Sequence, residues 1–255
     1  MENPAYDYDA NRPEYATVRR PDPTIAAFLR EAIGDARTVL NVGAGAGSYE
    51  PEDLYVTAIE PSAAMRESRL KLGRVPAVTA GAESIPFDDA SFDVAMGCLT
   101  IHHWPDVARG IREVRRVTRG KLLFVTFDPD GLGAFWNQEY FPELVAVERE
   151  RYPAFDTLRA ILPEEEFVAR PIPVPLRCTD GFQEAFYGRP EAFLDPVVRK
   201  SQSAWGFIDA DTEQRYVAAL RADLESGAWE RKYGHLRTQS HLVCGLSLVE
   251  FRPRL

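Results

Sequence analysis

Cysteines, lysines and long apolar runs are scarce in this sequence of 255 residues. The three cysteines, Cys98, Cys178 and Cys244, are far apart and form no CxxC pair, so nothing indicates a zinc or iron–sulfur site and we expect no metal. Such a scattered set fits a reducing compartment. No apolar run approaches the roughly 20 residues of a membrane helix, and the acidic, polar N-terminus is not typical of a signal peptide. We therefore expect a cytoplasmic protein that does not bind membranes.

The charge balance argues against another class of partner. Lys and Arg total 30 against 39 Asp and Glu, which gives a formal net charge of −9, and no run of basic residues offsets it. Because a negative surface repels a phosphate backbone, we expect no nucleic-acid binding. A hydrophobic content of 45% is that of an ordinary globular protein. We expect a monomer or homodimer that acts on a small molecule.

The first half of the chain alternates short apolar runs with amphipathic helical periods. The strand-like runs cover 37–43, 54–60, 75–80, 91–99 and 121–128, and the helical segments cover 24–34, 61–73 and 105–120. Asp22 and Ser62 are suited to cap the first two helices. This alternation predicts a doubly wound parallel sheet, in which ligands bind outside the carboxyl ends of the strands.

The second half is richer in aromatic and helical signals. It predicts a helix over 132–153, an edge strand within 167–178 because of its prolines, and a last strand over 241–253, with a helical lid inserted before that strand. Its aromatic residues are candidates for an apolar substrate pocket, although core packing is the alternative for each. These residues are Phe135, Trp136, Tyr140, Phe182, Phe186, Tyr187, Trp205 and Phe207.

A glycine-rich loop and an acidic residue end the first two strands. Gly43, Gly45 and Gly47 allow a tight turn and a close approach of ligand to backbone, and Glu60 can accept both hydroxyls of a ribose. A plain turn and a solvated carboxylate are the alternatives. The spacing is GxGxG rather than the dinucleotide GxGxxG, and Pro51 limits any crossover helix to about one turn, too little to bind a pyrophosphate. The pattern favours S-adenosylmethionine (SAM), which has no phosphate, over NAD.

Four motifs in order resemble the class I SAM-dependent methyltransferases. They are VLNVGAGAGSYE, AIEPSAAM, AGAESIPFDDASFDVAM, and CLTIHHWPD followed by IREVRRVTRGKLLFVTFD. The closest branch contains ubiquinone/menaquinone-biosynthesis and antibiotic-pathway methyltransferases. The resemblance implies a Rossmann-like, seven-stranded, mostly parallel sheet with an antiparallel last strand. It implies one domain, with a cofactor core at about 8–130, lid elements at about 131–240 and the last strand at about 241–252.

The resemblance also implies SAM as cofactor, with S-adenosylhomocysteine (SAH) as its product, and a set of contacts. The glycine loop would wrap the amino-acid end, Glu60 would hold the ribose, and the residues after it would border the adenine. The implied set is Tyr15, Arg19, Asn41, Gly43, Ala44, Gly45, Glu60, Pro61, Met65, Ala82, Glu83, Cys98 and Leu99.

Two parts of this set need comment. Tyr8, Tyr15 and Arg19 match an N-terminal pattern that caps the cofactor in relatives, with Arg19 on the SAM carboxylate; helix packing is the alternative for the tyrosines. Asn41 stands where the family usually has Asp, and Gly81 stands where many relatives have an Asp that reads the adenine amino group. Both departures remove a charge from the expected contacts.

Two histidines are the candidates for catalysis. His102 and His103 follow the 91–99 strand, where the methyl group would be presented, and a neutral imidazole suits deprotonation of an acceptor. Packing or capping by one of them is the alternative. Asp128, at the end of the 121–128 strand, is a candidate to orient that histidine or to bind substrate, or it caps a loop.

We therefore expect methyl transfer from SAM to the O, N or C atom of a small, fairly hydrophobic metabolite, in bacterial secondary metabolism. Two alternatives remain. One is a methyltransferase-fold enzyme that catalyses a non-methylating step such as cyclisation, and the other is a SAM-binding protein without transfer activity.

Overall fold

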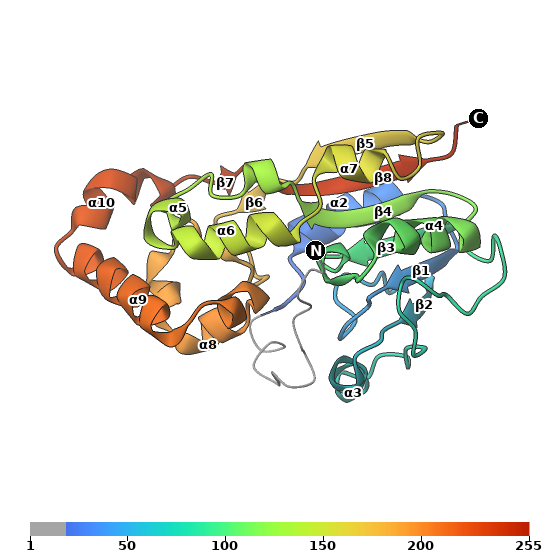
Figure 1. The fold of residues 1–255 in the computed structure, drawn as a ribbon, viewed down its shortest axis with the longest axis horizontal. Coiled ribbons are helices and arrows are strands. Elements are labelled where there is room, and N and C mark those ends of the chain that lie inside the picture. The colour runs from blue at the N-terminus through green and yellow to red at the C-terminus, as the bar shows by residue number, and fades with distance from the viewer. Residues whose placement is uncertain (1–18, 255) are drawn as a thin grey trace.

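A mixed six-stranded sheet organises the chain, for which the computed structural model describes residues 19–254 (Figure 1). The strand order is β2-β1-β3-β4-β8-β5, with β1–β4 parallel and β8 antiparallel to both of its neighbours. The strands are β1 (Thr38–Val42), β2 (Tyr55–Ile59), β3 (Val94–Cys98), β4 (Leu122–Phe127), β5 (Glu166–Pro171) and β8 (Leu246–Arg252). The predicted α/β class, the edge strand and the antiparallel last strand are confirmed.

The expected seventh strand is absent from this sheet within residues 19–254. The 75–80 segment forms only an isolated bridge, between Val78 and Ile59. Val75 and Val78 are 69% and 39% exposed, so the segment has no buried face to favour strand pairing. Pro76 also removes a backbone donor. A separate short ladder joins β6 (Val174–Pro175) to β7 (His241–Leu242).

Helices flank the sheet where the capping signals predict them. The helix α2 (Pro23–Ile33) begins at Asp22, whose side chain accepts from the Thr24 backbone amide. The helix α3 (Ala63–Lys71) is capped in the same way by Ser62, and α4 (Val107–Val117) by Asp106. Each cap satisfies a backbone N–H that has no partner inside the helix, which fixes where the chain leaves the preceding strand.

Most helices of the second half lie beyond one end of the sheet, at the left of Figure 1, whereas β5 and β8 are part of the sheet. The predicted 132–153 helix is interrupted before Pro142, giving α5 (Asn137–Tyr140) and α6 (Pro142–Arg151), because proline lacks the N–H that would continue the first helix. The remaining helices are α7 (Phe155–Arg159), α8 (Pro196–Lys200), α9 (Ala210–Glu225) and α10 (Ala228–Tyr233). As predicted, most of the helices that follow the edge strand lie between β6 and β7.

Most of the aromatic residues in this region pack against one another. The Trp136 ring makes edge-to-face contacts with Tyr140, Phe193 and Trp229 at centroid distances of 5.5 to 6.0 Å, and its Nε1 donates to the Tyr187 carbonyl at 2.7 Å. Such pairs stabilise a core beyond their buried area. Of the eight candidates for a substrate pocket, only Phe182 lines either cavity described below, so core packing, the stated alternative, describes most of the others.

A buried ion pair holds the crossover from β1 to β2, which contains no helix. The Arg69 guanidinium of α3 donates to both carboxylate oxygens of Glu50, from Nη1 at 2.7 Å and from Nη2 at 2.9 Å. Asn41 on β1 donates from Nδ2 to Glu50 Oε1 at 2.9 Å. All three side chains are buried. This network takes the place of the helix that a longer crossover would supply.

Replacing Arg69 by Met should lower the free energy of unfolding by about 3–5 kcal/mol, because Glu50 would remain buried without its cation. Urea denaturation measures the change. The matched control, Glu67→Gln, breaks the exposed Lys71–Glu67 pair and should change stability by less than about 1 kcal/mol. Equal effects of the two substitutions would contradict a structural role for the buried pair.

Candidate functional site

A cavity of about 760 Å³ lies at the carboxyl ends of β1, β2 and β3. This is the switch region, where the chain crosses from β2 back past β1 to β3, and ligands of parallel sheets bind in such places. The volume falls in the range of ordinary small-molecule sites. The cavity therefore has the position and size expected for a nucleoside-type ligand.

The turn after β1 brings the backbone to the wall of this cavity. Gly43 has φ +65° and Gly45 has φ +53°, which only glycine adopts without strain. A Cβ atom on Gly43 would lie 2.0 Å from Thr100 Oγ1, so no side chain fits there, whereas a Cβ on Gly45 would meet nothing within 4 Å. The Ala44 amide donates to the Ile59 carbonyl of β2 at 3.0 Å. Gly43 thus allows a close approach of the Thr100 side chain, and the approach of a ligand to this backbone stays a prediction.

Glu60 ties the loops after β1 and β2 together. Its Oε2 accepts from the Gly45 amide and its Oε1 from the Ser62 amide, both at 2.8 Å. The side chain is buried yet lines the cavity, and each carboxylate oxygen has a further lone pair. A carboxylate fixed in this way can accept two hydroxyl groups of a ribose.

The cavity brings together almost the whole predicted cofactor set. Its lining includes Arg19, Asn41, Gly43, Ala44, Gly45, Glu60, Pro61, Met65, Ala82, Glu83, Cys98 and Leu99. Tyr8 and Tyr15 lie outside the described residues. Leu99 has φ +51°, an uncommon conformation for a leucine, at the point where β3 ends. That these side chains contact the cofactor stays a prediction.

Asn41, the departure from the family pattern, has a structural reason. Its side chain lies 2.9 Å from Glu50, so an aspartate at this position would set two carboxylates against each other. The amide instead donates to Glu50 and keeps one negative charge behind the cavity wall. Sequence reasoning missed Glu50, although its place in a helix-free crossover after the glycine loop was visible.

Arg19 has a protein partner that the sequence did not reveal. Its Nε donates to Asp180 Oδ1 at 2.5 Å, and Tyr49 donates from its hydroxyl to Asp180 Oδ2 at 2.7 Å. Asp180 is buried and lines the cavity. It lies 161 residues from Arg19 in the sequence, in a segment without a motif, so only the fold could bring the two together.

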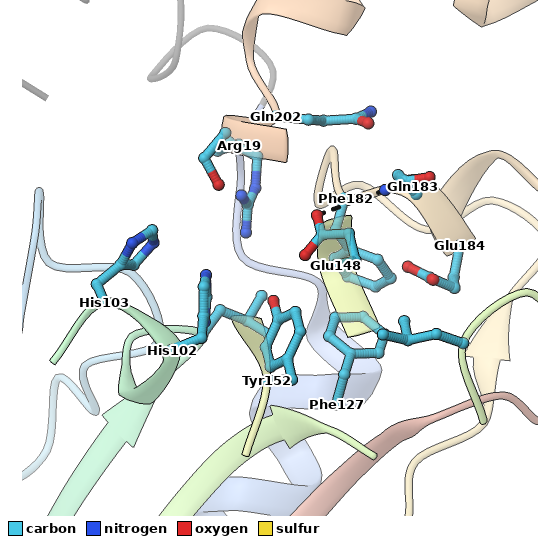
Figure 2. A pocket seen from close by; sticks show the side chains of 13 residues that line it. Arg19, His102, His103, Phe127, Glu148, Tyr152, Phe182, Gln183, Glu184 and Gln202 are labelled. Atoms are coloured by element: carbon cyan, nitrogen blue, oxygen red, sulfur yellow. Dashed lines mark hydrogen bonds between the residues drawn. The ribbon is translucent and has the colours of Figure 1, made fainter. Parts of the chain in front are cut away.

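A second, narrower cavity of about 30 Å³ adjoins the first (Figure 2). The two share Arg19, Leu99 and His103. In Figure 2, His103 and Arg19 lie on one side of this cavity, and Glu148 and Glu184 lie across from His103. These three shared residues therefore form the boundary between a group bound in the large cavity and a molecule in the small one.

Both histidines are electrically neutral near pH 7. Burial, reinforced by the Arg151 and Arg19 cations, lowers the pKa of His103 to about 3. Burial, with His103 and the same arginines, also lowers the pKa of His102 well below its usual range. His103 Nδ1 lies 3.3 Å from Arg151 Nη2, and a guanidinium only donates, so Nδ1 accepts and the ring proton is on Nε2. This geometry favours hydrogen-bond donation by His103 over proton abstraction.

Asp128 does not join the histidines. Its side chain accepts from the Asp130 backbone amide and caps the 3₁₀ turn η2 (Pro129–Gly131), and it lines neither cavity. Asp128 therefore caps a loop, which was the alternative role, because the chain turns away from the site directly after β4. The structure gives no support to the predicted catalytic role of Asp128.

Two buried carboxyl groups line the second cavity. Burial raises the pKa of Glu184 to about 8, with Glu148 adding to the shift, and burial likewise raises the pKa of Glu148. Within residues 19–254 no cluster of three or more His, Cys, Asp or Glu side chains is arranged to hold a metal ion. Over the same residues, no helix has both the length and the apolar character to span a bilayer.

A sheet of this order with a nucleoside-sized cavity at its switch region defines a Rossmann-like enzyme domain. The family model described as a methyltransferase domain matches residues 40–125. An uncharacterized methyltransferase of Mycobacterium tuberculosis is 36% identical over 136 residues, covering 51% of this chain and 49% of that protein. A ubiquinone/menaquinone biosynthesis C-methyltransferase of Geobacter is 30% identical over 131 residues, covering 45% and 56%. The chain thus spans about half the length of these relatives.

The similarity to a solved structure is more extensive. A putative methyltransferase from an antibiotic biosynthesis pathway of Anabaena variabilis superposes with a TM-score of 0.85 at 28% identity, covering 92% of this chain and 98% of that one. Residues 40–125 therefore form a methyltransferase domain, and the chain has the fold of the class I SAM-dependent methyltransferases. The methyl donor of such domains is SAM, which leaves as SAH.

Gly43→Ala should abolish measurable SAH binding and cost about 2 kcal/mol more stability than Gly34→Ala. Both glycines have nearly the same φ, but a Cβ on Gly34 meets nothing within 4 Å, so Gly34→Ala adds only backbone strain of about 1–2 kcal/mol. Calorimetry with SAH and thermal unfolding measure the two effects. Unchanged SAH affinity in Gly43→Ala would show that the turn does not contact the ligand.

Glu184→Gln should change how stability depends on pH. Because the pKa of Glu184 is about 8 in the folded protein against an ordinary 4.5, the native stability that depends on its proton is complete below pH 4.5 and is lost as the pH rises to about 8. The Gln variant lacks this loss, so its stability relative to the wild type should rise across that window by on the order of 5 kcal/mol. Urea unfolding at several pH values tests this, and parallel profiles would contradict it.

Proposed function

We propose that the protein transfers a methyl group from SAM to a small molecule, one end of which enters the second cavity. The observation that carries this proposal is the meeting of two cavities at Arg19, Leu99 and His103, one large enough for SAM and the other lined by polar and aromatic side chains. Methyl transfer requires a donor and an acceptor held in line, and two compartments with one shared boundary provide that arrangement.

The residues present fit SAM. Glu60, fixed by two backbone amides, would accept the ribose hydroxyls. The Gly43–Gly45 turn would lie against the amino-acid end, and the buried Asp180 carboxylate would offset the positive charge there. When bound, SAM supplies a methyl group already activated by its sulfonium, so the protein needs mainly to position the acceptor and exclude water.

His103 is the side chain best placed to orient the acceptor. It borders both cavities, and its Nε2 carries the ring proton because Nδ1 accepts from Arg151. The His102 ring lies 3.9 Å from it and 4.2 Å from Tyr152, centroid to centroid, and so supports its orientation. We infer a positioning role for both histidines. The acceptor atom, O, N or C, decides whether a proton must leave as well.

The wider setting is proposed on less specific grounds. The likeness to an antibiotic-pathway protein over nearly the whole chain supports an acceptor from bacterial secondary metabolism. All three cysteines are free thiols, which supports a cytoplasmic location. One buried apolar cluster includes residues of α2 and β4 as well as of α9 and α10, which supports a single domain.

Incubation with methyl-labelled SAM and candidate metabolites tests the function directly. Label in a product is the expected result, and Glu60→Gln should weaken SAH binding by roughly 10- to 100-fold, because it removes charge-assisted acceptors from the ribose site. Exposed Glu67→Gln is the control and should bind SAH normally. A new product without label would support a non-methylating reaction, and absence of SAH binding in the wild type would refute the proposal.

A further inference from the structure

The second cavity carries information about the chemical class of the acceptor. We propose that the acceptor is a protonated amine, whose ammonium group enters the second cavity and is held there by Glu148 and Glu184, while the rest of the molecule extends past His103 into the large cavity. This inference rests on the proposed function, because it assumes that the second cavity is the acceptor site. The ammonium is the group that the protein recognises, and the atom that receives the methyl group is at the opposite end of the acceptor, beside His103.

The first support is an unsatisfied buried acceptor. Glu148, on α6, is 9% exposed, and its Oε2 accepts no hydrogen bond from any residue between 19 and 254. Its Oε1 receives only a long bond, 3.4 Å, from Gln183. Figure 2 shows the Glu148 carboxyl group directed into the cavity. A buried carboxylate oxygen without a donor costs free energy, which a ligand N–H group would recover.

The second support is the balance of charge around the cavity. The cations near it already have partners: Arg19 is paired with Asp180 at 2.5 Å, and Arg151 donates to Ser203 Oγ at 3.0 Å and to His103. Arg151 Nη1 is 3.8 Å from Glu148 Oε2, beyond hydrogen-bond length.

The remaining groups that face the cavity do not alter this balance. Both histidines are neutral, and burial raises the pKa of Tyr152 far above its usual range, so its phenol is neutral as well. Among residues 19–254, the charged or ionisable groups that line this cavity, besides the histidines and Tyr152, are Arg19, which is already paired with Asp180, and the carboxyl groups of Glu148 and Glu184. Neither carboxyl group has a cation within hydrogen-bond distance in this part of the chain, and a ligand ammonium would supply one.

The third support is the nature of the cavity wall. Phe127, Tyr152 and Phe182 line the space next to the two carboxyl groups, with ring centroids 5.3 Å apart for Phe127–Tyr152 and 5.7 Å for Phe127–Phe182. Aromatic faces beside carboxylates attract ammonium groups through cation–π and ionic contacts together. The same wall repels carboxylates and phosphates, so an anionic acceptor is disfavoured.

In the ligand-free protein, one of the two buried carboxyl groups, Glu184, retains its proton. Because the pKa of Glu184 is about 8, this group is protonated at pH 7 until a cation arrives. Binding of an ammonium would favour the carboxylate and release that proton. Glu148 and Arg151 on α6, Glu184 on η3 (Gln183–Phe186), Arg19, and the two neutral histidines are the groups that set this equilibrium.

Matched amines and alcohols test the proposal on the SAH-loaded protein. Ethylamine, isobutylamine and benzylamine are compared with ethanol, isobutanol and benzyl alcohol by thermal unfolding and by calorimetry at pH 7 in two buffers of different ionisation enthalpy. At least one amine should bind roughly tenfold more tightly than its alcohol, with release of a proton to the buffer. Glu184→Gln and Glu148→Gln should each reduce that preference by roughly tenfold and leave SAH affinity unchanged.

The control variant is Glu150→Gln, which removes an exposed carboxylate from the same helix and should keep the amine preference. Equal binding of amines and alcohols, absence of amine binding, or an unchanged preference in both cavity variants would overturn the proposal. Since SAH binding is measured in every sample, its loss in the wild type would instead count against the proposed function itself.

Discussion

The Glu60 carboxylate is the interaction on which the site depends. It accepts from the amide of Gly45 after β1 and from the amide of Ser62 before α3, and so joins the two loops through one side chain. The same carboxylate faces the cavity. Because these two amides fix the carboxylate at the cavity wall, it would be pre-positioned to accept ribose hydroxyls, as proposed above.

Charge is distributed unevenly around this centre. Asp180 lines the large cavity and Glu50 lies behind its wall; Asp180 is paired with the partly buried Arg19 and Glu50 with the buried Arg69. The second cavity has carboxyl groups in excess, and its histidines are held neutral by burial and by Arg151. A cationic sulfonium and a cationic acceptor would repel each other in water, so a protein that brings them together must supply carboxylates on both sides of the transfer point.

The sequence predicted the cofactor half better than the acceptor half, and the reason is physical. The glycines, Glu60 and the capping residues act through local backbone geometry, which neighbouring residues determine. Glu148, Asp180 and Glu184 come from distant segments, and nothing in their local sequence distinguishes them from surface carboxylates. The aromatic residues of the C-terminal region did not identify a substrate pocket, because packing around Trp136 uses the same residue types as an apolar pocket. The 75–80 run failed as a strand because a valine pattern carries no information about exposure.

A crystal structure with SAH bound is the most direct measurement of the central claim, that two cavities meet where a methyl group passes from cofactor to acceptor. The account predicts both ribose hydroxyls on the Glu60 carboxylate and the SAH sulfur turned toward the boundary formed by Arg19, Leu99 and His103. A ligand whose ribose lies away from Glu60, or whose sulfur points away from the second cavity, would contradict it.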